Sequence, residues 1–207
     1  MRQASQWSMA VAVIALAACS SSKDASRTDS MSATSTTTTT TAAGDSARRD
    51  SASAGGAMSD ANIMAKEIAA DSGEVALATY VRSHASDAGV KSYAGELVSD
   101  HSKGEKEAKA LASKLSITPQ PAANDTTSQA TEHAMSRFAS LKGHDLDTAF
   151  VAHEIEDHKT DIDDAHKASA AAQNAEVKQF VDKTIPELQK HLDRAQALDK
   201  KLSGKKS

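Results

Sequence analysis

The chain has 207 residues, enough for one domain with extensions, and a formal net charge of −4. This acidic balance argues against nucleic acid as a partner, because nucleic-acid binding needs a clustered basic face. The lone cysteine, Cys19, excludes an intrachain disulfide and a cysteine-based zinc site, and the scarcity of aromatic, glycine and proline residues predicts helices rather than strands.

Residues 1–18 have the features of a signal peptide. Arg2 supplies a basic start, and the apolar stretch 9–18 is too short to span a bilayer as a helix. The sequence Leu-Ala-Ala-Cys that ends at Cys19 resembles the lipobox of bacterial lipoproteins. The resemblance implies cleavage before Cys19, a diacylglycerol on its thiol and, with Ser20 next, export to the outer membrane. The alternative is an ordinary signal peptide followed by a chance cysteine.

Residues 19–58 are rich in Ser, Thr, Ala and Asp and include a run of threonines at 36–41. They lack apolar periodicity, so they cannot bury enough surface to offset chain entropy. This composition predicts a disordered tether that holds a folded domain, residues 59–207, away from the membrane. The expected location is therefore the cell envelope, facing the periplasm, with the membrane as a partner through the lipid and any protein partner unknown.

From residue 59 onward, apolar residues recur at three- and four-residue steps, the spacing of amphipathic helices. Ser59 and Asp60 can cap a first helix that ends near His84, and Asp87 can cap a second. A polar loop follows, with Pro119 among its residues.

A short helix is predicted over residues 127–140, closed by Gly143. A third long helix is predicted over 146–171, and a fourth begins near residue 175 and contains Pro186, which should bend it. Helices of this kind must pack on one another, so the fold class is all-α: a four-helix bundle with a short extra helix before the third long helix. The long connection between the second and third helices allows a crossover, as in ferritin-like bundles, and an up-down-up-down order is equally allowed.

Several short pieces of the domain are similar to the DUF4142 family, a ferritin-like group often described as outer-membrane proteins. The matching pieces are Gly73-Glu74, Leu77-Ala78, Val90-Lys91, Asp100-His101, Leu146-Asp147, Phe150, Asp157-His158, Ile185-Pro186, Leu188 and His191-Leu192. Ile185 stands where the family pattern commonly has Leu. The resemblance implies a ferritin-like fold over nearly the whole domain, but it implies no activity, because the family has no agreed one.

Each long helix places one potential metal ligand on its inward stripe: Glu74, His101, His158 and His191. Burying such groups without partners is costly. Imidazoles and a carboxylate at a bundle centre predict a site for a transition-metal ion, with Fe, Mn, Zn, Cu and Ni all open.

Asp100, Asp157 and Glu187 lie beside these residues in sequence and could either ligate the ion or orient the imidazoles from a second shell. The di-iron pattern of ferritin-like proteins needs Glu-x-x-His on two helices, and no Glu in this chain has His three positions later. The sequence therefore favours a His-rich mononuclear site over ferroxidase chemistry.

The alternative interpretation is a buried hydrogen-bond network that only fixes helix register. The further acids and histidines of the third long helix, among them Glu154, are interpreted as a solvated face, and Glu67 as a residue that reaches solvent. His84, His133 and His144 are expected at the surface.

The sequence has no Gly-rich phosphate loop and no Gly-x-Ser-x-Gly elbow, so an enzyme is not favoured. Two functions are favoured over a third, weaker option, a redox enzyme such as an oxidase. The first is a metal-binding lipoprotein of the cell envelope; the second is a non-enzymatic structural, stress-related or protein-interaction lipoprotein whose polar core is purely structural.

Overall fold

The computed structural model describes residues 58–204, which form helices and connecting loops with no strand among them. The predicted signal peptide, Cys19 and the tether up to residue 57 lie outside the described residues. The helices are α1 (Asp60–His84), α2 (Ala88–Lys114), α3 (Thr127–Ala139), α4 (Gly143–Ala171) and α5 (Ala175–Ser203). None of these helices is apolar over a stretch long enough to cross a membrane.

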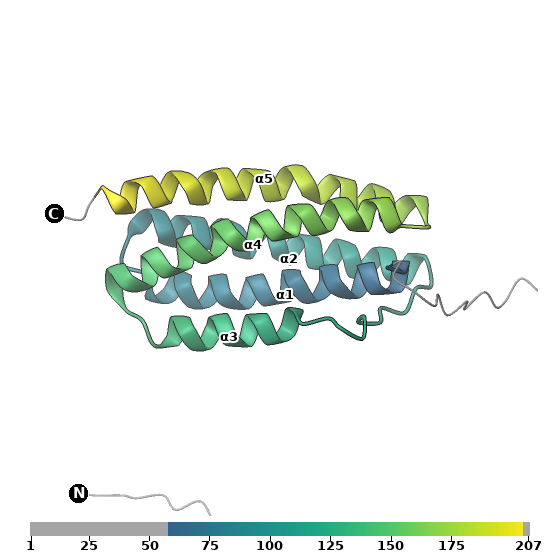
Figure 1. Ribbon diagram of the computed structural model, residues 1–207, viewed down its shortest axis with the longest axis horizontal. Coiled ribbons are helices and arrows are strands. Elements are labelled where there is room, and N and C mark those ends of the chain that lie inside the picture. Colours follow the sequence, from purple (N-terminus) through teal and green to yellow (C-terminus); the bar gives the residue numbers. More distant parts are fainter. Residues whose placement is uncertain (1–57, 205–207) are drawn as a thin grey trace, which may run out of the picture. The chain divides into compact units, whose positions relative to one another are not determined.

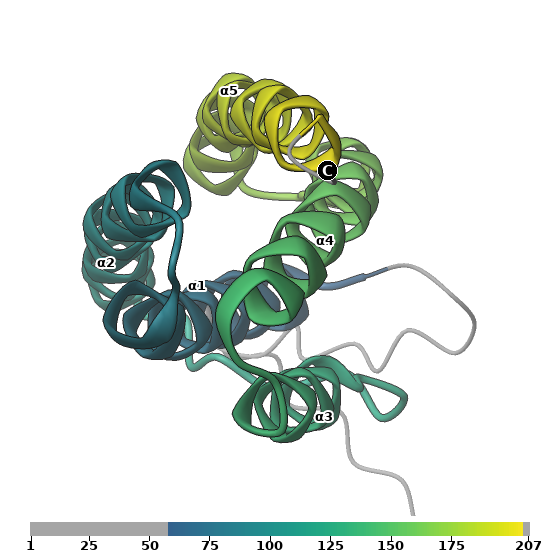
Figure 2. The same cartoon turned by 90° about the vertical axis from the view of Figure 1, so that its left-hand side faces the viewer.

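The four long helices form a bundle of two antiparallel hairpins, α1–α2 and α4–α5, and α3 lies outside it along α1 (Figures 1 and 2). The connection between the hairpins runs back along the bundle through α3, so α2 and α4 point in the same direction (Figure 1). In cross-section, α1 neighbours α2 and α4, while α5 packs on α4 and α2. The bundle with a short extra helix is therefore confirmed, and its order is the crossover rather than up-down-up-down.

The helices begin where the sequence offers side-chain caps. Ser59 and Asn62 form a reciprocal capping box at α1, and Asp87 accepts hydrogen bonds from the first backbone N–H groups of α2. The prediction for Gly143 was wrong: α3 ends at Ala139, and Gly143, with a φ of +59°, is the first residue of α4. Glycine tolerates this left-handed conformation, so it allows the sharp entry into α4.

Two aspartates tie one hairpin to the other. Asp147 of α4 is 1% exposed and accepts hydrogen bonds from the backbone N–H groups of Ser86 and Asp87, both at 2.9 Å, in the α1–α2 turn. At the opposite end, Asp60 of α1 accepts from the backbone of the α4–α5 turn at 2.9 and 3.0 Å. These contacts at both ends fix the axial position of one hairpin against the other.

The bundle core consists of two apolar layers with a polar layer between them. The larger apolar layer includes Leu77, Tyr93, Leu97, Phe138, Phe150 and Leu198, and the smaller includes Ile63, Met64, Ala108, Ala165, Val177 and Val181. α5 continues without interruption through Pro186, which is exposed. The polar layer contains the three inward histidines that the sequence pattern indicated.

Candidate metal centre

Three histidines from three helices meet in the polar layer. His101 of α2, His158 of α4 and His191 of α5 are 7%, 0% and 2% exposed. Their ring centroids are 5.3 to 5.8 Å apart, and one ring nitrogen from each lies within 4.8 Å of the other two. The packing therefore brings three imidazoles to a common point, which periodicity alone could not place.

Each of these rings has its second nitrogen fixed by an acceptor. Nδ1 of His101 donates to Asp71 at 2.7 Å, and Nε2 of His191 donates to Asp100 at 3.1 Å. Nδ1 of His158 donates to the backbone carbonyl of Glu154, one turn earlier, at 3.0 Å. Metal-ligating histidines in proteins characteristically make this second contact, which fixes their tautomer and orientation.

The other ring nitrogen of each histidine points toward the centre of the cluster. Because a neutral imidazole carries a single proton, the donations described above leave Nε2 of His158 and Nδ1 of His191 unprotonated, and these two atoms lie 3.3 Å apart. Nε2 of His101 is buried and has no hydrogen-bond partner among the described residues. Two facing acceptors and one buried unpartnered nitrogen are unfavourable unless a cation or a proton lies between them.

Electrostatics keep two of the rings neutral. Burial, followed by the neighbouring histidines, lowers the pKa of His158 to about 3, and burial also lowers the pKa of His191. At His101, burial works in the same direction, but the hydrogen bond to Asp71 and the charge of Glu74 outweigh it and raise the pKa. Neutral imidazoles with free lone pairs are the form that binds metal ions.

Two carboxyl groups lie buried beside the histidines. Glu74 of α1 is 5% exposed and Glu154 of α4 is 0% exposed; among the described residues, their carboxyl groups interact with each other and have no other hydrogen-bond partner. Burial raises the pKa of Glu74 to about 7, and burial together with the charge of Glu74 raises that of Glu154 well above its usual range. Burial therefore favours the protonated, uncharged form of both carboxyl groups in the polar layer.

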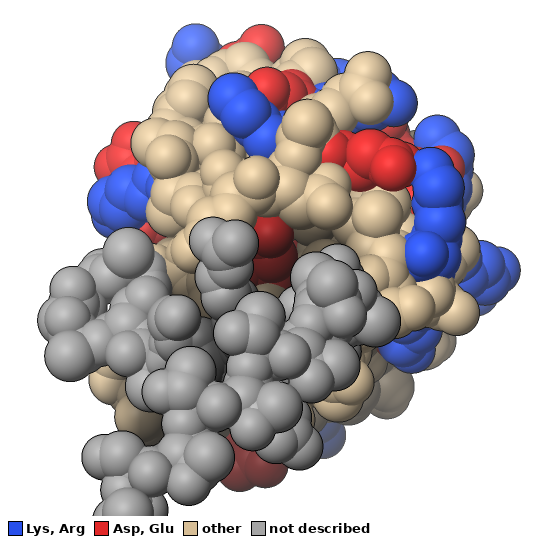
Figure 3. Space-filling view, turned by 90° about the vertical axis from the view of Figure 1, so that its right-hand side faces the viewer, with Lys and Arg blue, Asp and Glu red and all other residues tan. Residues whose placement is uncertain are grey.

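A cavity of about 60 Å³ adjoins the histidines, bordered by Glu74, His101, Asp161 and His191 among others. It extends toward the end of the bundle where α1 begins, since Met58 and Ile63 also line it. Figure 3 views this end and shows acidic side chains recessed between the surrounding ones. The cavity has space for a few water molecules or a small ligand next to the imidazoles.

The predicted ligand set is brought together in part. The three histidines converge, whereas Glu74 does not belong to the group within 4.8 Å and instead forms the cavity wall. Of the three predicted second-shell acids, Asp100 contacts His191. Asp157 is half-buried, Glu187 is exposed at the cavity edge, and no hydrogen bond joins either to the histidines in residues 58–204.

The sequence interpretation missed four acids of the polar layer. Asp71 is the hydrogen-bond partner of His101, and Asp161 borders the cavity with a pKa raised to about 8 by burial and by Asp157. Glu154 was assigned to a solvated face, which was wrong, because it is fully buried. Glu67 is half-buried, and burial, then the charge of Asp71, raises its pKa to about 7. The available signal was spacing, since Glu67, Asp71 and Glu74 follow one another on one face of α1.

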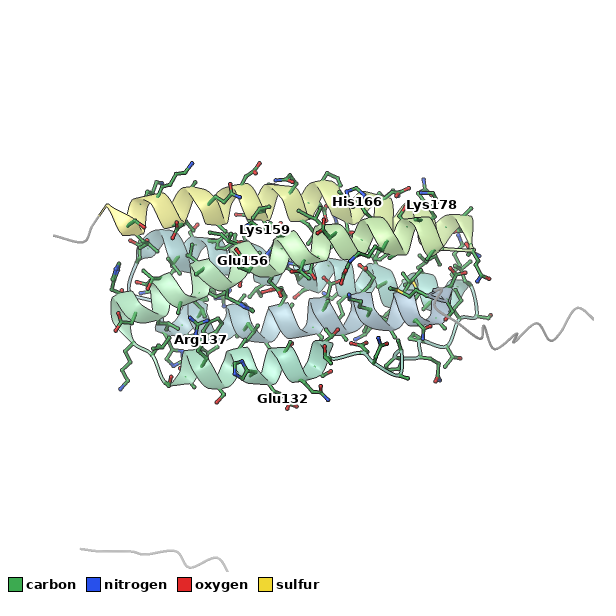
Figure 4. All side chains as sticks on the ribbon, in the orientation of Figure 1. Glu132, Arg137, Glu156, Lys159, His166 and Lys178 are labelled. Atoms are coloured by element: carbon green, nitrogen blue, oxygen red, sulfur yellow. The ribbon has the colours of Figure 1, made fainter. Side chains whose placement is uncertain are left out.

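Other residues of α4 do face solvent. Glu156 and His166 are exposed and lie on the outer surface (Figure 4). His84, His133 and His144 are also exposed, which confirms their expected surface positions.

The fold and the polar layer define an all-helical bundle protein with a buried histidine cluster. A family comparison identifies the chain more closely: the model of a domain of unknown function, DUF4142, matches residues 45–198, well over half of the chain. The chain therefore belongs to the DUF4142 family, as the residue pattern predicted. Comparisons with curated proteins and with solved structures gave no match.

Proposed function

We propose that this protein is a metal-binding lipoprotein of the cell envelope, which holds one transition-metal ion between His101, His158 and His191. The observation that carries the proposal is the 3.3 Å approach of Nε2 of His158 to Nδ1 of His191, whose other ring nitrogens each contact an acceptor, beside the unpartnered nitrogen of His101. A metal cation between the three rings would satisfy all of these groups at once.

The spacing of the nitrogens supports this assignment. Two nitrogens bound tetrahedrally to zinc at the usual bond length are about 3.3 Å apart. Nε2 of His158 and Nδ1 of His191 are separated by 3.3 Å. The acceptors Asp71, Asp100 and the carbonyl of Glu154 hold the rings in place, so little ordering remains to be done when the ion binds.

The ligand chemistry narrows the choice of ion. Three imidazoles favour Zn²⁺, Cu²⁺, Ni²⁺ or Fe²⁺, whereas Mg²⁺, Ca²⁺ and Mn²⁺ favour carboxylate and water oxygens. Three protein ligands leave a further position, on the cavity side, for water or an exchangeable ligand. Such a site suits a protein that takes up and releases an ion in the envelope.

The lipidated Cys19, the tether and the outer-membrane location belong to this proposal on the strength of the sequence pattern alone. The label ferritin-like belongs to it as well, supported by the single long crossover between the two hairpins, which ferritin-like folds share.

The test is the metal content of the full-length protein, purified in detergent without a His tag and stripped with a chelator. The protein is offered Fe, Mn, Zn, Cu and Ni in turn, washed, and measured by mass spectrometry. We expect about one ion of an imidazole-favouring metal per chain, lost in His158→Ala and kept in His133→Ala, a matched change at an exposed histidine of α3. No retained metal, or equal retention by both variants, would instead support the structural-network alternative.

A further inference from the structure

The cavity beside the three-histidine centre has a strongly acidic wall. Seven acidic side chains of α1, α2, α4 and α5 line it, and Lys66 is the one Lys or Arg among the described residues that do so. Lys66 is paired with Asp164, which is itself one of the seven. The wall therefore carries a large excess of groups that can hold negative charge.

Two of these acids lack a cationic partner. Glu67 of α1 and Asp161 of α4 are half-buried, and within residues 58–204 neither forms a hydrogen bond or a salt bridge. Burial, then the charge of Asp71, raises the pKa of Glu67 to about 7, and burial, then the charge of Asp157, raises that of Asp161 to about 8. A divalent cation in the cavity would supply the compensating charge that the wall lacks.

The cavity leads from the surface to the histidines. Toward its outer end, the side chains of Lys66 and Asp164 are 30% and 25% exposed, and Figure 3 shows acidic side chains recessed at this end of the bundle. At its inner end, His101 and His191 are only 7% and 2% exposed. Nε2 of His101 is buried there without a hydrogen-bond partner among the described residues, so a group that can bind a cation lies where the cavity ends.

The acids of α1 follow this path inward. Glu67, Asp71 and Glu74 are separated by four and three residues, so they share one face of the helix and extend over about 10 Å along its axis. In the described part of the chain, no three acids of the wall bring their ligand atoms within 4.8 Å of one another. Acids spaced in this way attract a cation without chelating it, so the ion can pass on to the imidazoles.

We infer that this cavity is the entry route by which a hydrated divalent cation reaches the three histidines, and that Glu67 and Asp161 are the carboxyl groups that guide it. The inference rests on the proposed function, because it names the path to the same site. A cleft lined by charge of one sign can raise the rate of association by about 10- to 1000-fold. The cavity between α1, α3 and α4, in contrast, has none of the three histidines in its wall.

The test measures the rate of Zn²⁺ uptake by the full-length protein, stripped of metal and kept in detergent at pH 8, where Glu67 is mainly ionised. Stopped-flow mixing with Zn²⁺ and a chromophoric chelator follows the disappearance of the free ion. At low salt, Glu67→Gln/Asp161→Asn should slow uptake by more than about ten-fold and still bind about one ion per chain at the end point. Added salt should slow the wild type more than this variant, because salt screens the guiding charges.

Two further variants sharpen the test. Glu156→Gln/Asp163→Asn removes the same two charges from exposed positions of α4 and should take up Zn²⁺ as the wild type does. Ala70→Leu adds bulk to the cavity wall without changing its charge, so it should slow both uptake and release to a chelator. Unchanged rates in Ala70→Leu would count against the route.

The outcomes separate the route from the site. If Glu67→Gln/Asp161→Asn takes up Zn²⁺ as fast as the wild type, or the exposed control slows equally, the route is overturned and the proposed three-histidine site stands. If the same variant binds no ion at the end point, the two carboxyl groups are ligands rather than guides, which also overturns the inference. If the wild type takes up none of Zn²⁺, Cu²⁺, Ni²⁺ and Fe²⁺, the route and the proposed function both fail.

Discussion

Replacing Glu74 by Gln should change how the stability of the metal-free protein depends on pH. The pKa of Glu74 is raised from 4.5 to about 7 by burial, so the folded protein holds a proton there that the unfolded chain releases at lower pH. A group with a raised folded-state pKa stabilises fully below pH 4.5, and its contribution is lost as the pH rises through about 7. At 1.36 kcal/mol per pKa unit, this loss amounts to about 3 kcal/mol.

The glutamine of Glu74→Gln cannot ionise, so the variant does not suffer this loss. The difference in unfolding free energy between the variant and the wild type should therefore increase by about 3 kcal/mol as the pH rises from 4.5 to 8. The assay is urea unfolding of both proteins at a series of pH values in the presence of a chelator. Glu156→Gln, at a side chain that is 75% exposed on α4, is the control and should follow the wild type. Parallel pH curves for wild type and Glu74→Gln would refute the reasoning that burial raises the pKa of Glu74.

Three further changes test other contacts. Asp71→Asn should remove the charge that orients His101 and weaken metal binding by about 10- to 100-fold in a competition titration, and unchanged affinity would argue against a second-shell role. Asp147→Ala should lower the unfolding free energy by about 2–4 kcal/mol in thermal unfolding, because it leaves backbone donors of the α1–α2 turn unpaired. A decrease below about 1 kcal/mol would contradict the stabilising role of these hydrogen bonds. A Cβ at Gly73 would overlap the Thr131 hydroxyl, so Gly73→Ala should lower the unfolding free energy by about 1–3 kcal/mol. Adding Thr131→Ala to this variant should restore its stability, and a double variant that stays destabilised would contradict the close approach of α3 to α1 at Gly73.

The helices could be predicted because their signals are local. The Ser59 hydroxyl and the Asp87 carboxylate cap α1 and α2 at the positions predicted from the sequence. The breaks in the apolar pattern coincide with the turns between the helices. Gly143 was misplaced because a glycine with positive φ suits either side of a helix boundary, and sequence does not distinguish the two.

The site could be predicted less completely. Helical periodicity shows which face a residue occupies but not its height in the bundle, so the meeting of His101, His158 and His191 had to come from packing. That height depends on distant contacts such as those of Asp147 with the α1–α2 turn. Glu154 was misassigned because α4 carries acids on both its buried and its exposed faces, and composition alone does not separate them.

The most direct test of the central claim is the X-ray absorption spectrum of the full-length protein loaded with the metal it retains. Three buried histidines around one ion predict three imidazole nitrogens at about 2.0–2.1 Å for zinc, with the multiple-scattering pattern of imidazole rings. The spectrum of His101→Ala should lose one of these rings. A spectrum that contains only oxygen ligands, or one that His101→Ala leaves unchanged, would contradict the assignment of the three histidines as the metal centre.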